Sequence, residues 1–323
     1  MLPTPGFCRT CRPTMPSASR PTPTRGMASQ GLKRSRVLVS TRRSASPVEL
    51  KATALERADG IATIWLNRPH RHNAWTGRMH TEYRWCLQEA DRDPAVGAIV
   101  VTGRGSSFCV GGDAQALQGH AERGSYDAGT PDELARPGYG RAAEFDAAFA
   151  YHYGLSKPVI AALNGRAAGV GLALACFTDL RFAAAGARYS TAHGKLNLPA
   201  EFGLSWLLPR MVGLSRANEL LLTSRTFTAE EGAALGVFND VFPAEEVLTR
   251  TYEYVSDLLA NVSPGSLQQT RWQIYGDLHR SAAESVVTSE TLVDEMMGEA
   301  DYREGVAAFM EKRPPRWRRP AKA

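Results

Sequence analysis

The chain has 323 residues, of which 43% are hydrophobic and 22% charged, and its formal net charge is +5. This composition supplies enough apolar side chains for a sizeable core and excludes a globally disordered protein. No apolar run approaches the roughly 18–20 residues that a membrane-spanning helix needs, so we expect no membrane partner.

The positive charge is concentrated at the N-terminus. Residues 1–48 hold nine Lys or Arg and no Asp or Glu, whereas the rest of the chain holds 29 basic and 33 acidic residues. The segment is rich in Pro, Ser and Thr without hydrophobic periodicity, which is typical of a disordered leader. Three interpretations of this segment are open: a dispensable leader, an organelle transit peptide, or a basic arm that binds nucleic acid. The third is disfavoured because no aromatic residues lie between the basic ones. We expect a cytoplasmic protein, or one of the mitochondrial matrix or another organelle if the leader is a transit peptide.

Order is expected to begin near Ala52. Two short alternating apolar runs flank Asp59-Gly60, which predicts a β-hairpin. Thr76 can cap a helix that extends to about Asp93. Short apolar strands are expected at residues 97–103, 158–165 and 179–185. Each strand leads through a glycine or polar turn towards helical sequence, and this alternation predicts an α/β fold with parallel strands.

The remaining segments are a polar stretch and a helical last third. Residues 119–141 are rich in Gly and Pro, which indicates a lid, a binding loop or disorder. Thr228 and Glu231 have the spacing of a capping box. Helical patterns follow at residues 244–261, 265–280, 281–297 and 301–312. We therefore divide the chain into a leader (1–48), a core domain (49–243) and a C-terminal helical region (244–323).

Two glycine-rich turns stand where a predicted strand gives way to a helix, "SSFCVGGD" at 106–113 and "NGRAAGVG" at 164–171. Taken singly, such a turn is more often ordinary turn chemistry. Two of them side by side can aim backbone N–H groups at one thioester enolate oxygen, and preorganised donors stabilise such an oxyanion. Neither turn contains a phosphate-binding P-loop or a dinucleotide-binding glycine motif.

Four segments, taken in order, resemble the enoyl-CoA hydratase/isomerase (crotonase) superfamily. They are "LNRPHRHNAW" (66–75), "IVVTGRGSSFCVGGD" (99–113), "KPVIAALNGRAAGVGLALACFTDLRFA" (157–183) and "LLTSRTFTAEEGAALGVFNDVFP" (221–243). The helix-like stretch at 301–317 is similar to the C-terminal helix of that family, so the resemblance covers about residues 52–317. It implies a ββα superhelix core, a C-terminal helical region that assembles homotrimers or hexamers, and an acyl-CoA thioester as substrate.

The same resemblance implies the binding groups. It places the two oxyanion donors on the N–H groups of Gly112 and Val170, the latter at a position where the family usually has glycine. It places the coenzyme A contacts on the backbone of Ala74, Cys109, Val110, Gly111 and Gly112. Coenzyme A is then part of the substrate, and no separate cofactor is expected. We expect Asp113 to cap a helix and Asp179 to support a strand junction. No His, Asp or Glu set has metal-ligand spacing, so no metal is expected.

The two glutamates that act in hydratases of this family are missing. Their positions hold Ala173 and His193, so the usual acid and base of hydration are absent. Glu201, in a run that is otherwise apolar or uncharged, resembles the single carboxylate of some isomerase members, and its neighbours would raise its pKa. The alternative is that Glu201 caps a helix starting near Phe202, or pairs with Arg210. His193 is either an assisting acid–base group, a water ligand or scaffolding.

We therefore predict an acyl-CoA-processing lyase or isomerase of the enoyl-CoA hydratase/isomerase type. Gly112 and Val170 would hold the enolate, Glu201 would act as the acid/base and His193 would be the second candidate. Thioester hydrolysis or C–C cleavage on the same fold is the alternative reaction. A non-catalytic CoA- or RNA-binding homologue is the alternative outside enzymes, although we do not expect nucleic acid as a partner.

Overall fold

The computed structural model describes residues 49–124 and 134–318. The predicted leader at 1–48 lies outside these residues. Residues 48–323 form one compact unit, and the boundary expected after residue 243 stays a prediction. In the part of the chain that the structure describes, no helix combines the length and the apolar character needed to cross a membrane.

The largest layer is a six-stranded sheet in the order β1-β2-β3-β5-β7-β10. Its strands are β1 (Thr53–Ala58), β2 (Ile61–Leu66), β3 (Ala98–Gly103), β5 (Val159–Leu163), β7 (Leu180–Ala184) and β10 (Asp240–Phe242). β1 and β2 form the expected hairpin, in which Asp59 and Gly60 have φ angles of 51° and 80°. These two residue types tolerate positive φ in tight hairpin turns. All other neighbouring strands are parallel, which confirms the predicted α/β class.

A second sheet, in the order β4-β6-β8-β9, collects the short strands. These are β4 (Ser107–Cys109), β6 (Arg166–Ala168), β8 (Arg188–Ser190) and β9 (Phe227–Thr228). The chain passes from the first sheet to the second three times, from β3 to β4, from β5 to β6 and from β7 to β8. After each passage it enters a helix, namely α2 (Ala114–Arg123), α3 (Val170–Cys176) or the 3₁₀ helix η4 (His193–Leu196). This is the repeated ββα core that the sequence predicts.

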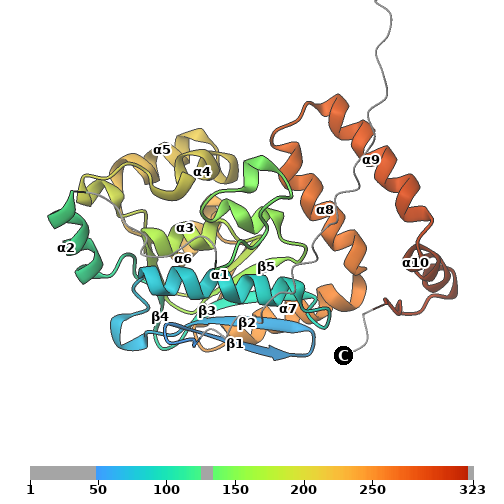
Figure 1. Cartoon of the computed structure of the whole chain (residues 1–323), viewed down its shortest axis with the longest axis horizontal. Helices are drawn as coiled ribbons and strands as arrows, with labels where there is room; N and C mark the ends of the chain where they lie inside the picture. The colour runs from blue at the N-terminus through green and yellow to red at the C-terminus, as the bar shows by residue number, and fades with distance from the viewer. Residues whose placement is uncertain (1–48, 125–133, 319–323) are drawn as a thin grey trace, which may run out of the picture. The chain divides into compact units, whose positions relative to one another are not determined.

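Helices cover both faces of the six-stranded sheet. Helix α1 (Gly77–Arg92), capped by Thr76 as expected, runs alongside β1, β2 and β3 (Figure 1). Helix α7 (Val247–Asn261) packs against β3, β5, β7 and β10. Neighbouring residues of β3 therefore enter different cores: Val101 belongs to the cluster that contains the α1 side chains, and Val100 to the cluster of α7. Alternation of side chains along a strand produces this division.

The last third is helical, as predicted. Helices α8 (Pro264–Asp277), α9 (Ala282–Met297) and α10 (Ala300–Glu311) follow α7 within about three residues of the expected bounds. Between the second sheet and β10 the chain forms α4 (Leu204–Val212), α5 (Leu214–Thr223) and α6 (Ala229–Leu235). Pro at the start of α8 and Ser caps on α8 and α9 account for where these helices begin.

Two local predictions are wrong in detail. The polar stretch at 119–141 begins inside α2, and residues 125–133 lie outside the described residues. Thr228 accepts the Glu231 N–H at the start of α6, but the Glu231 carboxylate pairs with Arg225. The capping box is therefore only half formed, because a charge-assisted partner binds the carboxylate that would have closed it.

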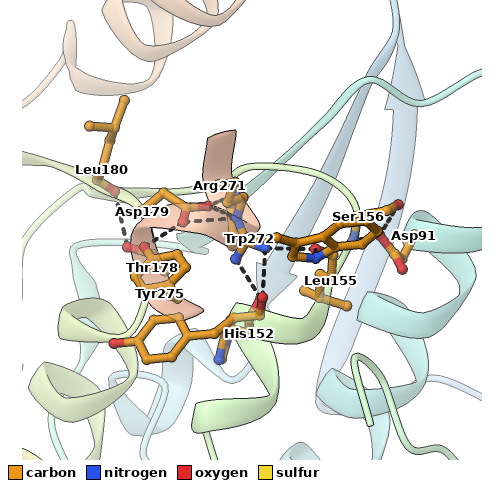
Figure 2. A network of polar contacts seen from close by, with 12 residues as sticks. Asp91, His152, Leu155, Ser156, Thr178, Asp179, Leu180, Arg271, Trp272 and Tyr275 are labelled. Atoms are coloured by element: carbon orange, nitrogen blue, oxygen red, sulfur yellow. Dashed lines mark hydrogen bonds and ion pairs between the residues drawn. The ribbon is translucent and has the colours of Figure 1, made fainter. Parts of the chain in front are cut away.

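Arg271 fastens α8 to the core (Figure 2). Its Nε donates to Asp179 Oδ2 at 2.7 Å, its Nη1 donates to the Leu155 carbonyl at 2.7 Å, and its Nη2 donates to the His152 carbonyl. The Tyr275 hydroxyl donates to Asp179 Oδ1 at 2.5 Å. Asp179 also accepts the Val159 N–H at 2.6 Å at the start of β5, so it supports a strand junction as expected, and it joins α8 to the core as well.

Candidate active site

The two glycine turns lie side by side. Strands β4 and β6 are parallel neighbours, so the turns that follow them meet at the same edge of the second sheet. A Cβ atom placed on Gly169 would lie 3.9 Å from Gly111 Cα, and one placed on Gly111 would lie 3.2 Å from the Ala168 carbonyl oxygen. Both glycines have positive φ angles, 49° and 107° respectively. A side chain at either position would strain the backbone, and one at Gly111 would also crowd the opposite turn.

Trp75 orients the first turn. Its N–H donates to the Gly111 carbonyl at 2.8 Å, and its carbonyl accepts the Asp113 N–H at 2.9 Å. Because the peptide between Gly111 and Gly112 is trans, the Gly112 N–H points away from Trp75. Over residues 49–124 and 134–318 this N–H has no acceptor, and Gly112 is exposed. The first predicted donor is therefore available to a ligand.

Val170 provides a second free N–H. Gly169 has φ 49° and ψ −125°, so the glycine absorbs the unusual conformation and Val170 begins α3 with a helical backbone. The Gly169 carbonyl accepts the Ala173 N–H at 3.0 Å, and the Val170 N–H of the same peptide points the other way. It has no acceptor among the residues that the structure describes. Val at this position is therefore compatible with a backbone donor.

Glu201 reaches the same turn from the 3₁₀ helix η5 (Glu201–Gly203). Its Oε2 lies 3.6 Å from the position that a Cβ on Gly169 would take. The side chain is half-buried and accepts no hydrogen bond from the described residues. Burial raises the pKa of the Glu201 carboxyl above its ordinary value, although the neighbouring His193 acts in the opposite direction. A poorly solvated carboxylate with free lone pairs has the properties of a general base.

Both structural alternatives for Glu201 are wrong. Helix α4 begins at Leu204 with Gly203 as its N-cap, and no side chain caps it. Arg210 donates to the Trp206 carbonyl at 2.7 Å, and its guanidinium carbon lies 4.2 Å from the centre of the Trp206 ring. Stacking on its own helix keeps Arg210 away from Glu201, which is left without an ionic partner in the described part of the chain.

His193 is close enough to Glu201 to influence its pKa. Only 6% of the residue is exposed, and its Nδ1 is fully covered without a hydrogen-bond partner among the described residues. The other hydratase position, Ala173, is completely buried in α3. An unpaired buried polar atom costs about 1–3 kcal/mol, so Nδ1 is a group that a polar ligand can satisfy. The structure thus brings His193 and Glu201 together and leaves no carboxylate at either hydratase position.

The segments expected to bind coenzyme A are also neighbours. The Val110 N–H donates to the His72 carbonyl at 3.3 Å, which places the loop around Ala74 beside residues 109–112. Arg68 Nη1 donates to the Ala74 carbonyl at 2.6 Å and stiffens that loop. The loop around Ala74 and residues 109–112 thus lie side by side, as a shared binding site requires. Their contact with coenzyme A stays a prediction.

Asp113 caps α2, as expected. It accepts the Gln115 N–H at 3.0 Å and pairs with Arg68 at 3.0 Å. Burial acts to raise the pKa of Asp113, but the Arg68 guanidinium and the Gln115 N–H together hold it below its usual value. In the described segments no group of His, Cys, Asp or Glu is arranged to hold a metal ion.

Comparison with known proteins assigns the family. Residues 56–320 match the family model of enoyl-CoA hydratase/isomerase. The chain belongs to the enoyl-CoA hydratase/isomerase family. An enoyl-CoA hydratase of Alternaria alternata, ACTT3, is 35% identical to this family member over 261 residues, which cover 80% of this chain and 83% of the relative. The 1,2-epoxyphenylacetyl-CoA isomerase of Escherichia coli (strain K12) is 32% identical over 260 residues, which cover 80% of this chain and 95% of the relative.

Solved structures support the same assignment. A probable enoyl-CoA hydratase/isomerase from Mycobacterium abscessus matches with a TM-score of 0.72 and 31% identity, covering 83% of this chain and 99% of that one. A putative enoyl-CoA hydratase from Streptomyces coelicolor A3(2) matches with a TM-score of 0.73 and 30% identity, covering 87% and 99%. Membership of the enoyl-CoA hydratase/isomerase family confirms the predicted crotonase fold and identifies an acyl-CoA-processing enzyme of this type.

Two residues that shape the site were not among the predicted site residues. Gly169 supplies the conformation that lets Val170 follow in a helix, and Trp75 holds the Gly112 turn. Gly169 had a signal in the sequence, because a glycine directly before a presumed donor often has positive φ. The pairing of Trp75 with Gly112 had none, because it joins segments 37 residues apart.

Proposed function

We propose that this enzyme is an enoyl-CoA isomerase in which Glu201 alone moves the proton. The observation that carries the proposal is the position of its half-buried, unpaired carboxylate beside Gly169, in the turn that presents the free Val170 N–H. Ala173 and His193 at the two hydratase positions agree with it, because a 1,3-proton shift needs one carboxylate and hydration in the usual way needs two.

The proposed reaction has two proton transfers. The Glu201 carboxylate removes a proton from the α-carbon of a 3-enoyl-CoA thioester, and the electron pair of that C–H bond passes into a dienolate. The N–H groups of Gly112 and Val170 stabilise the negative thioester oxygen. Protonated Glu201 then returns the proton to the γ-carbon, and the double bond moves from C3–C4 to C2–C3. The carboxylate is restored and no co-reactant is consumed.

The raised pKa of Glu201 suits both transfers. A carboxylate with an ordinary pKa is a weak base towards a carbon acid, whereas a poorly solvated one binds the proton more strongly. Protonated Glu201 must also give the proton back to the γ-carbon. A very strong base would hold it too tightly, so a pKa near the working pH suits both steps best. Burial of the carboxylate therefore contributes to the proposed chemistry.

Hydration is the second candidate, and His193 is the observation that favours it. Its covered Nδ1 has no partner among the described residues and lies within electrostatic reach of Glu201. Such a nitrogen can orient a water for addition to the β-carbon of a 2-enoyl thioester, with Glu201 as the base.

Product analysis distinguishes these reactions. Full-length protein would be incubated with 3-hexenoyl-CoA and, separately, with crotonyl-CoA, and products followed by mass spectrometry and NMR. We expect 3-hexenoyl-CoA to become 2-hexenoyl-CoA without a change in mass. A mass gain of one water from crotonyl-CoA would instead assign a hydratase, and release of free coenzyme A would assign a hydrolase. Absence of reaction with both thioesters would contradict the proposal.

The second donor can be removed by one substitution. Val170→Pro deletes the N–H, and Pro is well tolerated at the first position of a helix, which Val170 occupies. We expect kcat to fall by about 10²–10³-fold, the usual effect of losing one oxyanion donor. Val170→Ala, which keeps the N–H, is the control and should lose far less. If the proline variant is folded by circular dichroism and retains the rate of the alanine variant, Val170 is not an oxyanion donor.

We also propose that the protein is a homotrimer or hexamer joined through its C-terminal helices. Helix α9 buries no residue within the described chain, and α10 buries only Ala308. Exposed large hydrophobic residues on these helices are Val286, Val287, Val293, Met297, Tyr302, Val306, Phe309 and Met310. Apolar surface of this kind on a helix is typical of an interface. Sedimentation equilibrium should give three or six times the mass of the chain, and a monomer would reject the proposal.

A further inference from the structure

Phe202, which directly follows Glu201, has a left-handed backbone. Its φ and ψ angles are 50° and 32°, a conformation that bulky side chains rarely adopt. The left-handed residue lies inside η5 and breaks its helical backbone directly after Glu201, so it influences the direction of the Glu201 side chain. Non-glycine residues persist in such conformations only where their surroundings enforce them, and they gather at functional sites.

The surroundings that enforce this conformation are aromatic. The Phe202 ring meets the Phe149 ring edge to face, with centroids 5.1 Å apart and planes at 69°. Phe149 is fully buried and also has a positive φ, 61°. Edge-to-face pairs are favourable beyond the burial of their area. Two phenylalanines with positive φ thus hold one another directly beside the candidate base.

Phe149 is in turn fixed by polar contacts. Its carbonyl accepts a hydrogen bond from His152 Nδ1 at 2.5 Å, which leaves His152 Nε2 to accept the Tyr83 hydroxyl at 2.7 Å. Burial lowers the pKa of His152 to about 4, so the ring stays neutral and keeps this tautomer at neutral pH. The His152 carbonyl is bound by Arg271 (Figure 2). Phe149 is therefore a rigid support for the Phe202 ring.

Phe149 also contacts Trp75, the residue that orients the first predicted oxyanion donor. The Trp75 ring meets Phe149 edge to face at 5.8 Å, and the Trp75 backbone pairs with the turn that presents the Gly112 N–H. Phe149 therefore contacts both the residue that follows the base and the residue that orients the donor. This common contact links the positions of the two groups that must act on one substrate.

We propose that Phe202 is a positioning residue, whose ring, anchored on Phe149, holds the left-handed turn that directs the Glu201 carboxylate at Gly169. The inference rests on the proposed role of Glu201 as the base. Without the ring, the strained turn loses its anchor and Glu201 moves out towards solvent. Small displacements of a reacting group lower the rate of the chemical step more than they weaken substrate binding.

The test compares variants of full-length protein with 3-hexenoyl-CoA as the probe. Phe202→Leu keeps an apolar side chain but removes the ring, and we expect kcat to fall about tenfold or more with KM changed less than about twofold. Its pH–rate profile should begin to rise at lower pH, because a better-solvated Glu201 ionises more readily. Phe202→Tyr keeps the ring and should recover most of the rate.

Phe242→Leu is the matched control. Phe242 is also half-buried and meets the Phe182 ring at 5.7 Å, but it lies in β10 and packs against the core cluster of α7. Its variant should turn over like the wild type. A comparable loss of kcat in Phe242→Leu would show a general effect of cavity formation and would overturn the proposal.

The remaining outcomes separate this inference from the proposed function. If Glu201→Gln abolishes turnover while Phe202→Leu stays within twofold of the wild type, the positioning role is wrong and the proposed function stands. If Phe202→Leu raises KM and leaves kcat unchanged, the ring contacts substrate and the positioning role is again wrong. If Glu201→Gln turns over normally, the proposed function is rejected and this inference with it.

Discussion

Glu201→Gln is expected to lower kcat for isomerisation of 3-hexenoyl-CoA by about 10²–10⁴-fold, the usual contribution of a general acid–base group. The amide has nearly the same shape and cannot take a proton from carbon. KM should change little, because the two backbone N–H groups proposed to hold the thioester are unaffected. The first proton transfer can be measured alone by following, with NMR, the exchange of the α-hydrogens of butyryl-CoA in deuterium oxide. Glu201→Gln should lose this exchange together with isomerisation. Exchange at the wild-type rate would exclude Glu201 as the base.

The stability of the same variant should depend on pH in a defined direction. Burial raises the pKa of Glu201 in the folded protein, so the folded state resists ionisation. Below the unfolded pKa of about 4.3 the group is protonated in both states and contributes nothing. As pH rises through that value the unfolded chain ionises first, and the folded state becomes relatively less stable until its own pKa is passed. Glu201→Gln removes this effect.

We therefore expect Glu201→Gln to raise the midpoint of thermal unfolding at pH 7 and to leave it unchanged near pH 3.5. Glu253→Gln, at an exposed position on α7, is the control and should shift neither value appreciably. A group placed for catalysis at the expense of stability gives this result. A lower midpoint for Glu201→Gln at pH 7 would instead identify a structural carboxylate, such as a helix cap.

Arg271→Met is expected to lower the free energy of unfolding by about 3–5 kcal/mol, the range observed when one partner of a buried ion pair is removed. Arg271 is 5% exposed, and its guanidinium binds Asp179 together with the carbonyls of His152 and Leu155. Met fills part of the volume but leaves the Asp179 carboxylate without its positive partner and removes the guanidinium donors from the His152 and Leu155 carbonyls. Urea unfolding followed by circular dichroism measures the change.

Arg250→Met provides a matched comparison in the neighbouring helix α7. Arg250 also pairs with carboxylates, those of Glu246 and Glu253, but all three side chains are exposed. Solvent screens such pairs, so the unfolding midpoint should stay close to that of the wild type. Adding Asp179→Asn to Arg271→Met should cost less than the sum of the single changes, because the second substitution removes the uncompensated charge. Equal effects of Arg271→Met and Arg250→Met would show that the α8 anchor is not a major source of stability.

The secondary-structure elements and the two glycine turns could be predicted from local sequence patterns. The Asp59-Gly60 hairpin, the Thr76 cap and the parallel strands were predicted within a few residues, because turn chemistry and hydrophobic period act over short spans. Gly112 and Val170 were also placed by local pattern and family resemblance. The direction of a backbone N–H depends on the conformation of its turn, and the residues that form a turn largely determine that conformation.

The surroundings of Glu201 depend on contacts between distant parts of the chain and could not be predicted from the sequence. Its freedom from Arg210 follows from the stacking of Arg210 on Trp206, and its direction follows from the left-handed backbone of Phe202. The contact of Phe202 with Phe149 joins residues 53 positions apart, and the pair of Arg271 and Asp179 joins residues 92 apart. Burial, pairing and side-chain direction are set by such distant contacts, and no local pattern contains them. The sequence therefore indicated which carboxylate to consider, and the packing around it placed that carboxylate beside Gly169, the residue before Val170.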